Sequence, residues 1–343
     1  MSDSSHSKKN KPIIGISIGD YNGIGPEVVI KAVEDNRLLR FFTVVVYCDS
    51  RIISFYRKSL DLQNFNYNQI NSIDKVHHRR FNVLNVSAGD ELDISPGNGT
   101  KQSGSYALTS LKAAMEDLKS GKLNALCTAP LSKELVQSDS FNFPGHTEYL
   151  TEEDGANDSL MLLVNDGLRV GVVTGHIPIK EVPAALTADK IKTKLKILLK
   201  SLKHDFGKSK PRVAVLGLNP HAGENGLLGK EEEEIISPVI NKLKKDGHLV
   251  FGPYPADGFF GSAQFKSFDG ILAMYHDQGL IPFKNMAFES GVNFTAGLSF
   301  VRTSPDHGTA FSMAGTGSAD PASLRNALLT AYDIIQSRAE FSQ

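Results

Sequence analysis

Residues 213–229 read VAVLGLNPHAGENGLLG and contain the pattern that indicates the fold class. The apolar run Val213–Leu216 ends abruptly at glycine, asparagine and proline residues. A short apolar run closed by turn residues is typical of a buried parallel strand. Ligands of open α/β sheets bind at the carboxyl ends of such strands. His221 follows the turn at once, so we expect a ligand or an acid–base group there rather than a core residue.

The same arrangement occurs twice more in the chain. The strand-like run 169–174 leads to His176, and the run 270–275 leads to His276. Any one of these histidines alone is explained equally well by a structural hydrogen-bonding role. Three of them at strand ends favour a shared divalent-metal site, because neutral imidazole is the commonest transition-metal ligand and three leave positions open for water or substrate.

Composition and charge exclude several classes of partner. The chain has 343 residues, of which 41% are hydrophobic and 22% charged, and this is ordinary for a globular protein with room for two cores. The formal net charge is -1, which provides no basic field for nucleic acid or an anionic membrane. No apolar run approaches the roughly 18 residues that a membrane span needs. We therefore expect neither a nucleic-acid nor a membrane partner.

Cysteine usage and the N-terminus indicate the compartment. Cys48 and Cys127 are the only cysteines and lie in or beside apolar runs, without metal-ligand spacing. Two buried thiols favour a reducing compartment without a disulfide framework. Residues 1–11 are polar and lack the apolar core of a secretory signal. We expect a disordered tail over 1–11 and a cytoplasmic protein.

A strand, a glycine-rich turn and a helix open the folded part of the chain. The apolar run 12–18 predicts a strand, and residues 19–25, GDYNGIG, predict a tight turn. Pro26 and Glu27 suit the first turn of a helix. The turn amides either approach a ligand or simply connect the strand to the helix. The spacing is not the GxGxxG dinucleotide fingerprint.

Further periodic segments complete an α/β pattern. Residues 51–95 predict a helix followed by less regular, possibly antiparallel structure. The expected strands are 43–47 and 125–128, and the expected helices are 103–120, 186–202, 230–245 and 322–338. The acidic run 231–234 suits a helix N-terminus.

Several polar residues are candidates for anion binding or proton transfer. His146 and Thr147 stand at a predicted helix start and suit an anionic group, although a Thr N-cap explains Thr147 equally well. Asp257, in the loop 253–260, and Asp277, beside His276, are candidate supporting carboxylates or bases, although a turn-forming Asp is the commoner explanation at 257.

A cation, an amide and a guanidinium follow in the C-terminal part of the chain. Lys284, Asn293 and Arg302 are expected in loop or strand-edge settings. Together they suit a phosphate or a carboxylate, which Arg can bind bidentately. Each alone is more often an ordinary surface or salt-bridge residue.

Two segments resemble the isocitrate and isopropylmalate dehydrogenase superfamily. GDYNGIGPE, residues 19–27, is similar to the GDGIGPE loop of that group. HGTAFSMAGTGSADP, residues 307–321, is similar to its HGSAPDIAGKGIANP-type adenosine-binding loop. Those enzymes hold their metal with aspartates, whereas the candidates in this chain are histidines.

That difference, together with the motifs GHTE, TGHIP, LNPHAGENG and YHDQGLIPFK, resembles the 4-hydroxythreonine-4-phosphate dehydrogenase family from about Pro12 to Ala331. The resemblance implies an α/β fold of two α/β/α domains with a shared cleft. The first domain, 12–130 plus 290–343, would carry the glycine loop and the NAD-binding segment. The second, 131–289, would carry the metal histidines.

The resemblance also implies site residues and a homodimer whose active site, at the subunit interface, shares ligands between subunits. The implied metal ligands are His176, His221 and His276. The implied contacts to a small phosphorylated substrate are His146, Thr147, Lys284, Asn293 and Arg302. NAD would lie along 307–320, with contacts at His307, Gly308, Gly315, Gly317 and Asp320.

The chemistry implied is oxidation of 4-phosphohydroxy-L-threonine at C3 and decarboxylation to 3-amino-2-oxopropyl phosphate, in pyridoxine and pyridoxal 5′-phosphate biosynthesis. Asp257, Asp277 or Lys284 would assist proton transfer or orient a ligand. The metal stays open among zinc, cobalt, nickel, iron, manganese and magnesium, and NADP remains an alternative to NAD.

Alternative functions share much of this pattern. Related dehydrogenases act on phosphorylated threonate or erythronate, or on aromatic cis-dihydrodiols. A metal-dependent hydrolase would also use three histidines, but it needs no adenosine site. A non-catalytic metabolite-binding protein is the remaining alternative.

Overall fold

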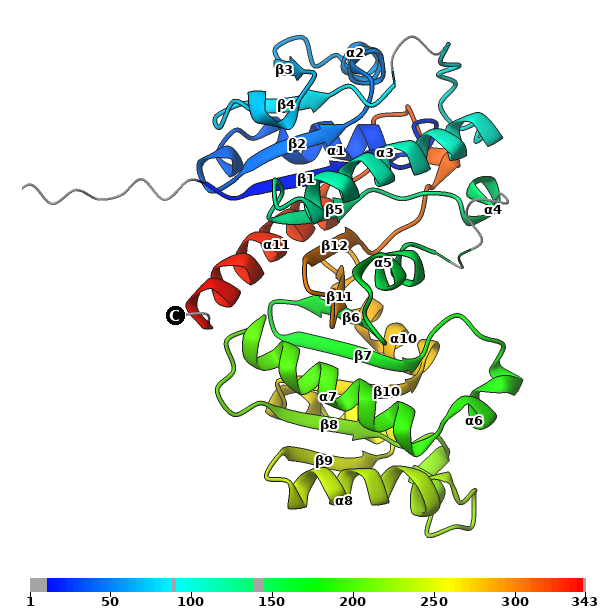
Figure 1. Cartoon of the computed structure of the whole chain (residues 1–343). Coiled ribbons are helices and arrows are strands. Elements are labelled where there is room, and N and C mark those ends of the chain that lie inside the picture. Colours follow the sequence, from blue (N-terminus) through cyan, green and yellow to red (C-terminus); the bar gives the residue numbers. More distant parts are fainter. Residues whose placement is uncertain (1–10, 88–90, 138–142, 144, 342–343) are drawn as a thin grey trace, which may run out of the picture. The chain divides into compact units, whose positions relative to one another are not determined.

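The computed structural model describes residues 11–87, 91–137, 143 and 145–341 (Figure 1). The chain divides into two compact units. The first extends to Leu135 and includes Thr309–Pro321; the second comprises Val136–Gly308 and the chain from Ala322. This division differs from the expected one, since most of 290–343 belongs to the second unit. The physical reason is strand pairing, because β11 (Val292–Ala296) pairs with β6 (Leu160–Asn165).

The first unit contains a parallel sheet. Its strand order is β3 (Tyr67–Ile70), β4 (Phe81–Leu84), β2 (Thr43–Tyr47), β1 (Ile13–Ser17) and β5 (Ala125–Thr128). Every residue of β2 is buried, as its continuous TVVVY run predicts for a parallel strand. The possible antiparallel structure within 51–95 is wrong: β3 and β4 pair in parallel, joined through a 3₁₀ turn, Ile73–Lys75.

The helices of the first unit follow the predicted pattern. They are α1 (Gly25–Glu34), α2 (Ser50–Ser59) and α3 (Lys101–Lys119), with a 3₁₀ turn at Leu38–Arg40 and another at Phe311–Met313. α3 begins two residues before the expected start, because Thr100 and Ser103 form a reciprocal capping box. A further short helix, α4 (Lys133–Val136), spans the boundary between the units.

The second unit contains a mixed sheet. Its order is β12 (Val301–Pro305), β11, β6, β7 (Leu168–Thr174), β10 (Gly270–Tyr275), β8 (Arg212–Leu216) and β9 (Leu249–Tyr254). β7, β10, β8 and β9 are parallel to their neighbours in that series. β6 runs antiparallel to β7, and β11 runs antiparallel to both of its neighbours. The parallel core therefore carries an antiparallel extension that the sequence pattern did not predict.

Helices and short turns connect these strands. The helices are α5 (His146–Asp154), α6 (Val182–Ala185), α7 (Ala188–His204), α8 (Ser237–Lys245), α9 (Ala256–Gly261), α10 (His276–Ala287) and α11 (Ala322–Phe341). The 3₁₀ turns are η3 (Ile179–Glu181), η4 (Pro220–Gly223) and η6 (Gln264–Ser267), and η5 (Glu232–Ile236) is a π-helical turn. The helix expected at 230–245 is thus a π turn that continues into α8.

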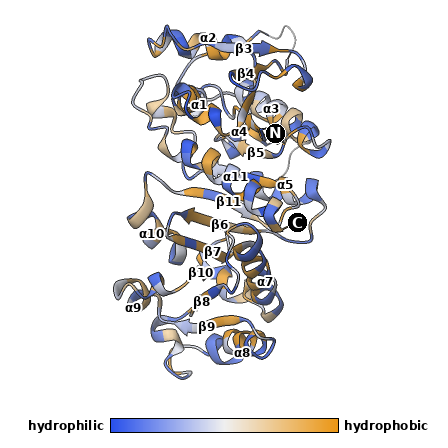
Figure 2. Cartoon of the chain, turned by 90° about the vertical axis from the view of Figure 1, so that its left-hand side faces the viewer, coloured by the Kyte–Doolittle hydropathy of each residue, from blue (hydrophilic) through white to orange (hydrophobic). Residues whose placement is uncertain are grey.

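An apolar core beneath the sheet fixes α10. Leu280, Phe283 and Ala287 lie on one face of this helix and are buried against β7, β10 and α9, where Phe259 joins them. Figure 2 shows the apolar strands and the alternation of apolar and polar colour along the helices. Burying one Phe side chain contributes about 1.5–3 kcal/mol. The core therefore holds the first turn of α10, with His276, at the end of β10.

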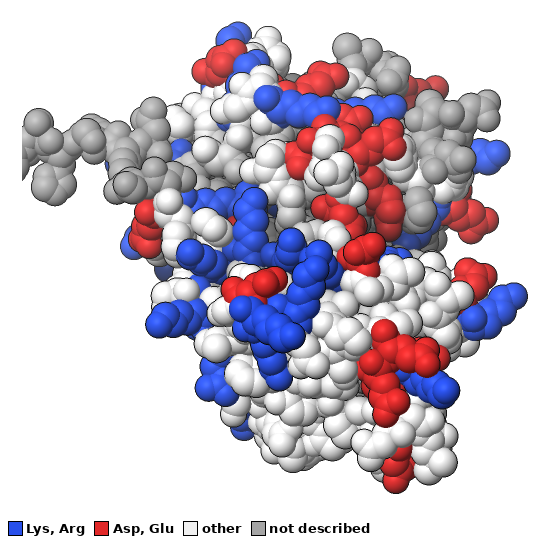
Figure 3. All heavy atoms as spheres, turned by 60° about the horizontal axis from the view of Figure 1, so that its bottom comes forward, with Lys and Arg blue, Asp and Glu red and all other residues white. Residues whose placement is uncertain are grey.

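The surface carries charges of both signs. Acidic and basic side chains both occupy the face shown in Figure 3, in agreement with the formal net charge of -1. Among the described residues, none of the helices combines the length and apolar character that crossing a bilayer requires.

Candidate active site

Three neighbouring parallel strands of the second unit each lead to one of the predicted histidines. β10 lies between β7 and β8, with Tyr275 in register with Thr174 and Leu272 in register with Val215. His276 follows β10 directly as the first residue of α10, and His176 lies two residues beyond β7. His221 lies five residues beyond β8, in η4. The carboxyl ends of parallel strands share one edge of a sheet, so the fold places all three histidine segments at that edge.

Two of the three imidazoles are adjacent. The ring centroids of His176 and His276 are 5.2 Å apart, with 46° between the ring planes. Nδ1 of His276 lies 2.7 Å from Oδ1 of Asp277. A carboxylate only accepts hydrogen bonds, so Nδ1 carries the proton here, and in the neutral ring the lone pair is on Nε2. Asp277 therefore orients this ring in the way that outer partners of metal-binding histidines do.

The third imidazole does not complete a cluster within one chain. In the part of the chain that the structure describes, no three His, Cys, Asp or Glu side chains are gathered closely enough to hold a metal ion. The donor chemistry of the adjacent pair suits zinc, cobalt or nickel. One described chain thus provides two neighbouring imidazole donors.

Asp257 belongs to an element next to His221. It lies in the first turn of α9, and not in a loop as expected, because Pro255 starts a helix there. α9 packs against η4, the turn that contains His221. The two candidate carboxylates thus accompany different histidines: Asp257 is near the η4 turn and Asp277 contacts His276.

Lys284 lies on the same helix as His276. The expectation of a loop or strand-edge setting is wrong, since α10 continues through Lys284 to Ala287. Its Nζ is 3.4 Å from Oδ1 of Asp306, whose side chain is largely buried at the end of β12. Burial raises the pKa of Asp306, although the charges of Lys284, His307 and His276 oppose the rise. The Asp306 carboxylate therefore interacts electrostatically both with Lys284 and with His276 at the histidine edge.

Asn293 and Arg302 face the same side of the β11–β12 pair. Asn293 is in register with Ser304, and Nη1 of Arg302 donates to Oγ1 of Thr295 at 3.0 Å. Arg302 is 2% exposed, so its charge is held inside the unit. Oδ1 of Asn293 is buried and has no hydrogen-bond partner among the described residues. A bound ligand or a water molecule could supply the donor for such an acceptor.

Thr147 and His176 line a common cavity. Its volume is about 470 Å³, and Lys194 also lines it. Thr147 is the second residue of α5, where the N-cap is Gly145, so an N-cap role does not explain Thr147. His146 is the first residue of the same helix. Backbone amides at a helix start and the Thr147 hydroxyl can bind an anion there.

The predicted cofactor segment crosses the boundary between the units. His307 and Gly308 belong to the second unit, whereas Gly315, Gly317 and Asp320 belong to the first. Both Gly315 and Gly317 have φ of +76°, a conformation that favours glycine. The exposed residues Thr316, Ser318 and Asp320 offer hydroxyl and carboxylate groups suited to a ribose.

Glu27 and Lys31 clamp this segment onto α1. Glu27 is 0% exposed and accepts hydrogen bonds from the amides of Gly317, at 3.4 Å, and Ala319, at 3.0 Å. Nζ of Lys31 donates to the carbonyl oxygens of the same two residues, at 2.5 and 2.9 Å. Glu27 is therefore a buried tertiary anchor, beyond its favourable place in the first helical turn.

The N-terminal glycine loop is a structural turn rather than an open anion cradle. The amide of Ile24 donates to the carbonyl of Thr309, and the amide of Asp20 to that of Pro130. The amide of Asn22 donates to the Asp20 carboxylate. These amides donate to groups within the first unit. This favours the interpretation that the turn simply connects the strand β1 to the helix α1.

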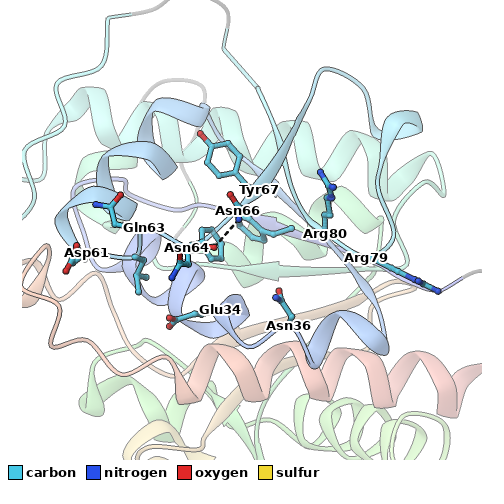
Figure 4. Close-up of a pocket in the computed structure, with 12 residues that line it drawn as sticks. Glu34, Asn36, Asp61, Gln63, Asn64, Asn66, Tyr67, Arg79 and Arg80 are labelled. Carbon is cyan, nitrogen blue, oxygen red and sulfur yellow. Dashed lines mark hydrogen bonds between the residues drawn. The ribbon is translucent and has the colours of Figure 1, made fainter.

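A separate cavity lies at the β3 end of the first unit (Figure 4). Its volume is about 820 Å³, and its lining combines amides with Glu34, Asp61, Arg79 and Arg80. Asn66 donates to the carbonyl of Asn64 across its rim. None of its described lining residues is a predicted site residue, so this cavity is not the candidate active site.

Replacing Asp306 with a residue that cannot ionise should stabilise the fold relative to the wild type, and this stabilisation should increase as the pH rises. A raised pKa means that the folded state binds the proton more tightly, so ionisation destabilises it between the unfolded value, near 3.8, and the higher folded value. We expect the free energy of unfolding of Asp306→Asn, relative to that of the wild type, to increase as the pH rises above about 4. Urea unfolding across this range measures the difference. Asp246→Asn, at the exposed end of α8, is the matched control, and a gain that shrinks with pH would contradict the expectation.

Residues 40–331 match the model of a family described as pyridoxal phosphate biosynthetic protein PdxA. The chain belongs to this family. The match includes all three strand-end histidines, Lys284 and Arg302, and ends within α11.

Similar proteins share the PdxA-type sequence over nearly their whole length. A 4-hydroxythreonine-4-phosphate dehydrogenase from Bacteroides thetaiotaomicron is 45% identical over 96% of this chain and 91% of its own. A D-threonate 4-phosphate dehydrogenase from Pectobacterium atrosepticum is 39% identical over 91% and 96%. The solved structure of the Klebsiella pneumoniae 4-hydroxythreonine-4-phosphate dehydrogenase has a TM-score of 0.82, with 35% identity over 96% and 99%. These likenesses support a dehydrogenase role for the chain and favour it over a hydrolase.

Three acidic residues of this PdxA-family chain have contacts that sequence analysis missed. Asp306 pairs with Lys284, Glu27 anchors the predicted cofactor segment, and Glu232 contacts the loop that carries His221. The PDHG context of Asp306 was a usable signal, because the residue directly precedes the recognised HGTAF motif. Glu27 likewise ends the recognised GDYNGIGPE motif, whereas Glu232 carried no such signal, since an acidic residue early in a helix is ordinary.

Proposed function

We propose that the chain oxidises 4-phosphohydroxy-L-threonine at C3 and releases carbon dioxide, forming 3-amino-2-oxopropyl phosphate for pyridoxine and pyridoxal 5′-phosphate biosynthesis in the cytoplasm. The observation that supports this most directly is the set of three histidine segments at the ends of β7, β10 and β8 in a PdxA-family chain. Lys284, Asn293 and Arg302 supply a cation, an amide and a buried guanidinium for the anionic groups of the substrate.

His176, His221 and His276 would hold a divalent metal, with zinc, cobalt, magnesium or manganese as candidates. Bound there, the metal would supply Lewis-acid stabilisation of negative charge on the substrate oxygen. Because the described residues of one chain do not gather three such donors, we propose that the site is completed in a homodimer that shares ligands between its copies. In the neutral ring of His276, the contact of Nδ1 with Asp277 would leave the Nε2 lone pair available for the metal.

The protein residues divide the remaining tasks. Lys284 and Arg302 bind the substrate anions, and His146 with Thr147 adds donors at the start of α5. The C3 hydroxyl loses a proton to a base, for which Asp257 and Asp277 are the candidates, and C3 loses a hydride. The product is a ketone β to the carboxylate, so the carbon–carbon bond to the carboxylate breaks with its electron pair passing toward the ketone oxygen. Carbon dioxide leaves, and the carbon that carried it takes up a proton, which restores the ketone.

NAD would accept the hydride, bound along His307–Asp320 with Gly308, Gly315 and Gly317 in close backbone contact. The exposed hydroxyl and carboxylate groups of Thr316, Ser318 and Asp320 support this placement. Glu27 keeps the segment in its observed conformation. NADP is the alternative cofactor, and a parallel assay with each dinucleotide separates them.

Exposed apolar side chains on α10 and beyond the His221 turn support the homodimer. Ile281 lies on the outer face of α10, and Phe288 follows seven residues later, as the C-cap of the helix. Their side chains are 67% and 75% exposed. Leu227, which follows the His221 turn, is also exposed. Exposed apolar side chains that share one helix face can form part of a surface that another chain covers.

Replacing Phe288 with a charged residue should therefore weaken self-association. We expect Phe288→Asp to move the protein from dimer toward monomer, because an aspartate is costly to bury in an apolar interface. Light scattering coupled to size-exclusion chromatography measures the mass at several concentrations. Phe41→Asp, at an exposed apolar residue of the first unit, is the matched control. A Phe288→Asp protein that stays dimeric at micromolar concentration would refute this interface.

An NADH-absorbance assay tests the proposed reaction. The purified protein is given NAD, a divalent metal and either 4-phosphohydroxy-L-threonine or 4-phospho-D-threonate. Fast reduction with the first substrate, lost on adding a chelator, supports the proposal. Reduction only with the second supports the other candidate, favoured by the 39% identity to the D-threonate 4-phosphate dehydrogenase. No reduction with either contradicts both.

A further inference from the structure

The loop that carries His221 has an unusual backbone. Six consecutive residues, 221–226, have positive φ, and four of them are not glycine. The four are His221, at +54°, Ala222, at +51°, Glu224, at +44°, and Asn225, at +55°. Residues with a Cβ rarely adopt this conformation, and such strain persists only where the surrounding structure imposes it. Some other part of the second unit must hold this turn.

The carboxylate of Glu232 contacts the residues that precede the turn. Its Oε1 accepts hydrogen bonds from the amides of Leu218, at 2.7 Å, and Asn219, at 2.8 Å. Its Oε2 accepts from Nδ2 of Asn219 at 2.9 Å. Glu232 is 3% exposed, so these three hydrogen bonds take the place of hydrogen bonds to water. Glu231 also accepts from Nδ2 of Asn219, at 2.8 Å.

The turn is folded tightly around this carboxylate. A Cβ added to Gly223 would lie 2.6 Å from Oε2 of Glu232, and one added to Gly217 would lie 3.0 Å from Oε1. Glu232 also begins η5, a π-helical turn, and such turns are frequent at functional sites. The two glycines and the π turn give the carboxylate its close approach to the backbone.

A second contact joins this loop to the start of α10. Nε2 of Gln278 donates to the carbonyl of Gly217 at 2.6 Å, and Oε1 of Gln278 accepts from the amide of Met274 at 2.7 Å. Gln278 is two residues beyond His276. The loop before His221 is therefore bonded to Glu232 on one side and to the end of β10 on the other.

We propose that Glu232 is the positioning residue for His221. Its carboxylate acts through the amides of Leu218 and Asn219, holds the left-handed turn in place and so presents the imidazole in one orientation. Glu232 contacts neither the imidazole nor a reacting group in this arrangement. The inference rests on the proposed function in one respect, that His221 binds a divalent metal.

The test compares Glu232→Gln and Glu232→Ala with the control Glu234→Gln, an exposed neighbour in the same acidic run. Glutamine keeps the size of the side chain, but it replaces one acceptor oxygen with a donor. We expect Co²⁺ affinity, followed by visible absorption, to fall about 10- to 100-fold in Glu232→Gln, as is typical when an outer partner of a metal ligand is changed. Hydrogen exchange at the amides of Leu218 and Asn219 should accelerate in parallel. The control should match the wild type in both measurements.

The outcomes separate this inference from the proposed function. Wild-type Co²⁺ affinity in Glu232→Gln, or unchanged exchange at residues 218 and 219, would overturn the positioning role. If Glu232→Ala does not fold, the glutamine variant still decides. A wild-type protein that binds no divalent metal would contradict the metal-dependent function. The hydrogen-exchange rates at Leu218 and Asn219 would still show whether Glu232 holds the turn.

Discussion

His176→Ala is expected to lower kcat for NAD reduction by about 10³-fold or more, equivalent to about 4 kcal/mol of transition-state stabilisation. The His176 ring is adjacent to that of His276, so its loss removes one of two neighbouring nitrogen donors. Stoichiometry of bound Co²⁺ or Zn²⁺, measured by elemental analysis after dialysis, should fall with the activity. His176 is exposed at the end of β7, so the fold should survive the change.

The control for this variant is His248→Ala, which removes an exposed histidine before β9 and none of the predicted ligands. It should retain wild-type metal content and activity. A His176→Ala enzyme that keeps both would show that the adjacent pair of imidazoles does not bind the metal. Loss of activity with full metal content would instead assign His176 to the substrate, in accord with the cavity that it shares with Thr147.

Lys284→Met is expected to lower kcat/KM for the phosphorylated substrate about 100-fold, or about 2.7 kcal/mol. Methionine keeps most of the side-chain volume, so the change chiefly removes the ammonium charge that would bind the anion. Because Lys284 lies on α10 with its buried face fixed by Phe283, the helix should remain in place. Steady-state kinetics with varied substrate, at saturating NAD, measure the loss. A rise in KM for NAD of similar size would contradict a specific role in substrate binding.

The pair with Asp306 offers a second check on Lys284. If the lysine serves only to compensate the buried carboxylate, Asp306→Asn should remove the need for it, and the double variant should be as active as Asp306→Asn alone. If Lys284 binds the substrate, the double variant should remain about as impaired as Lys284→Met. The two outcomes differ by about two orders of magnitude in kcat/KM and are easily separated.

The parallel core could be predicted from local sequence because its signals are local. Thr43–Tyr47 and Gly270–Tyr275 have the predicted bounds, since each is a continuous apolar run ended by turn or polar residues. The antiparallel strands β6, β11 and β12 were not predicted. Their pairing partners lie far away in the chain, and their polar residues, such as Asn293 and Arg302, weaken the apolar pattern.

The sequence by itself determined that His176, His221 and His276 stand at strand ends, because an apolar run and the turn after it are properties of neighbouring residues. Only the tertiary structure decided which of them meet. β10 inserts between β7 and β8, an order that differs from chain order, and this brings His276 beside His176. The same holds for Glu27, Glu232 and Asp306, because a buried carboxylate is recognised by its donors, and those donors are supplied by the folded chain.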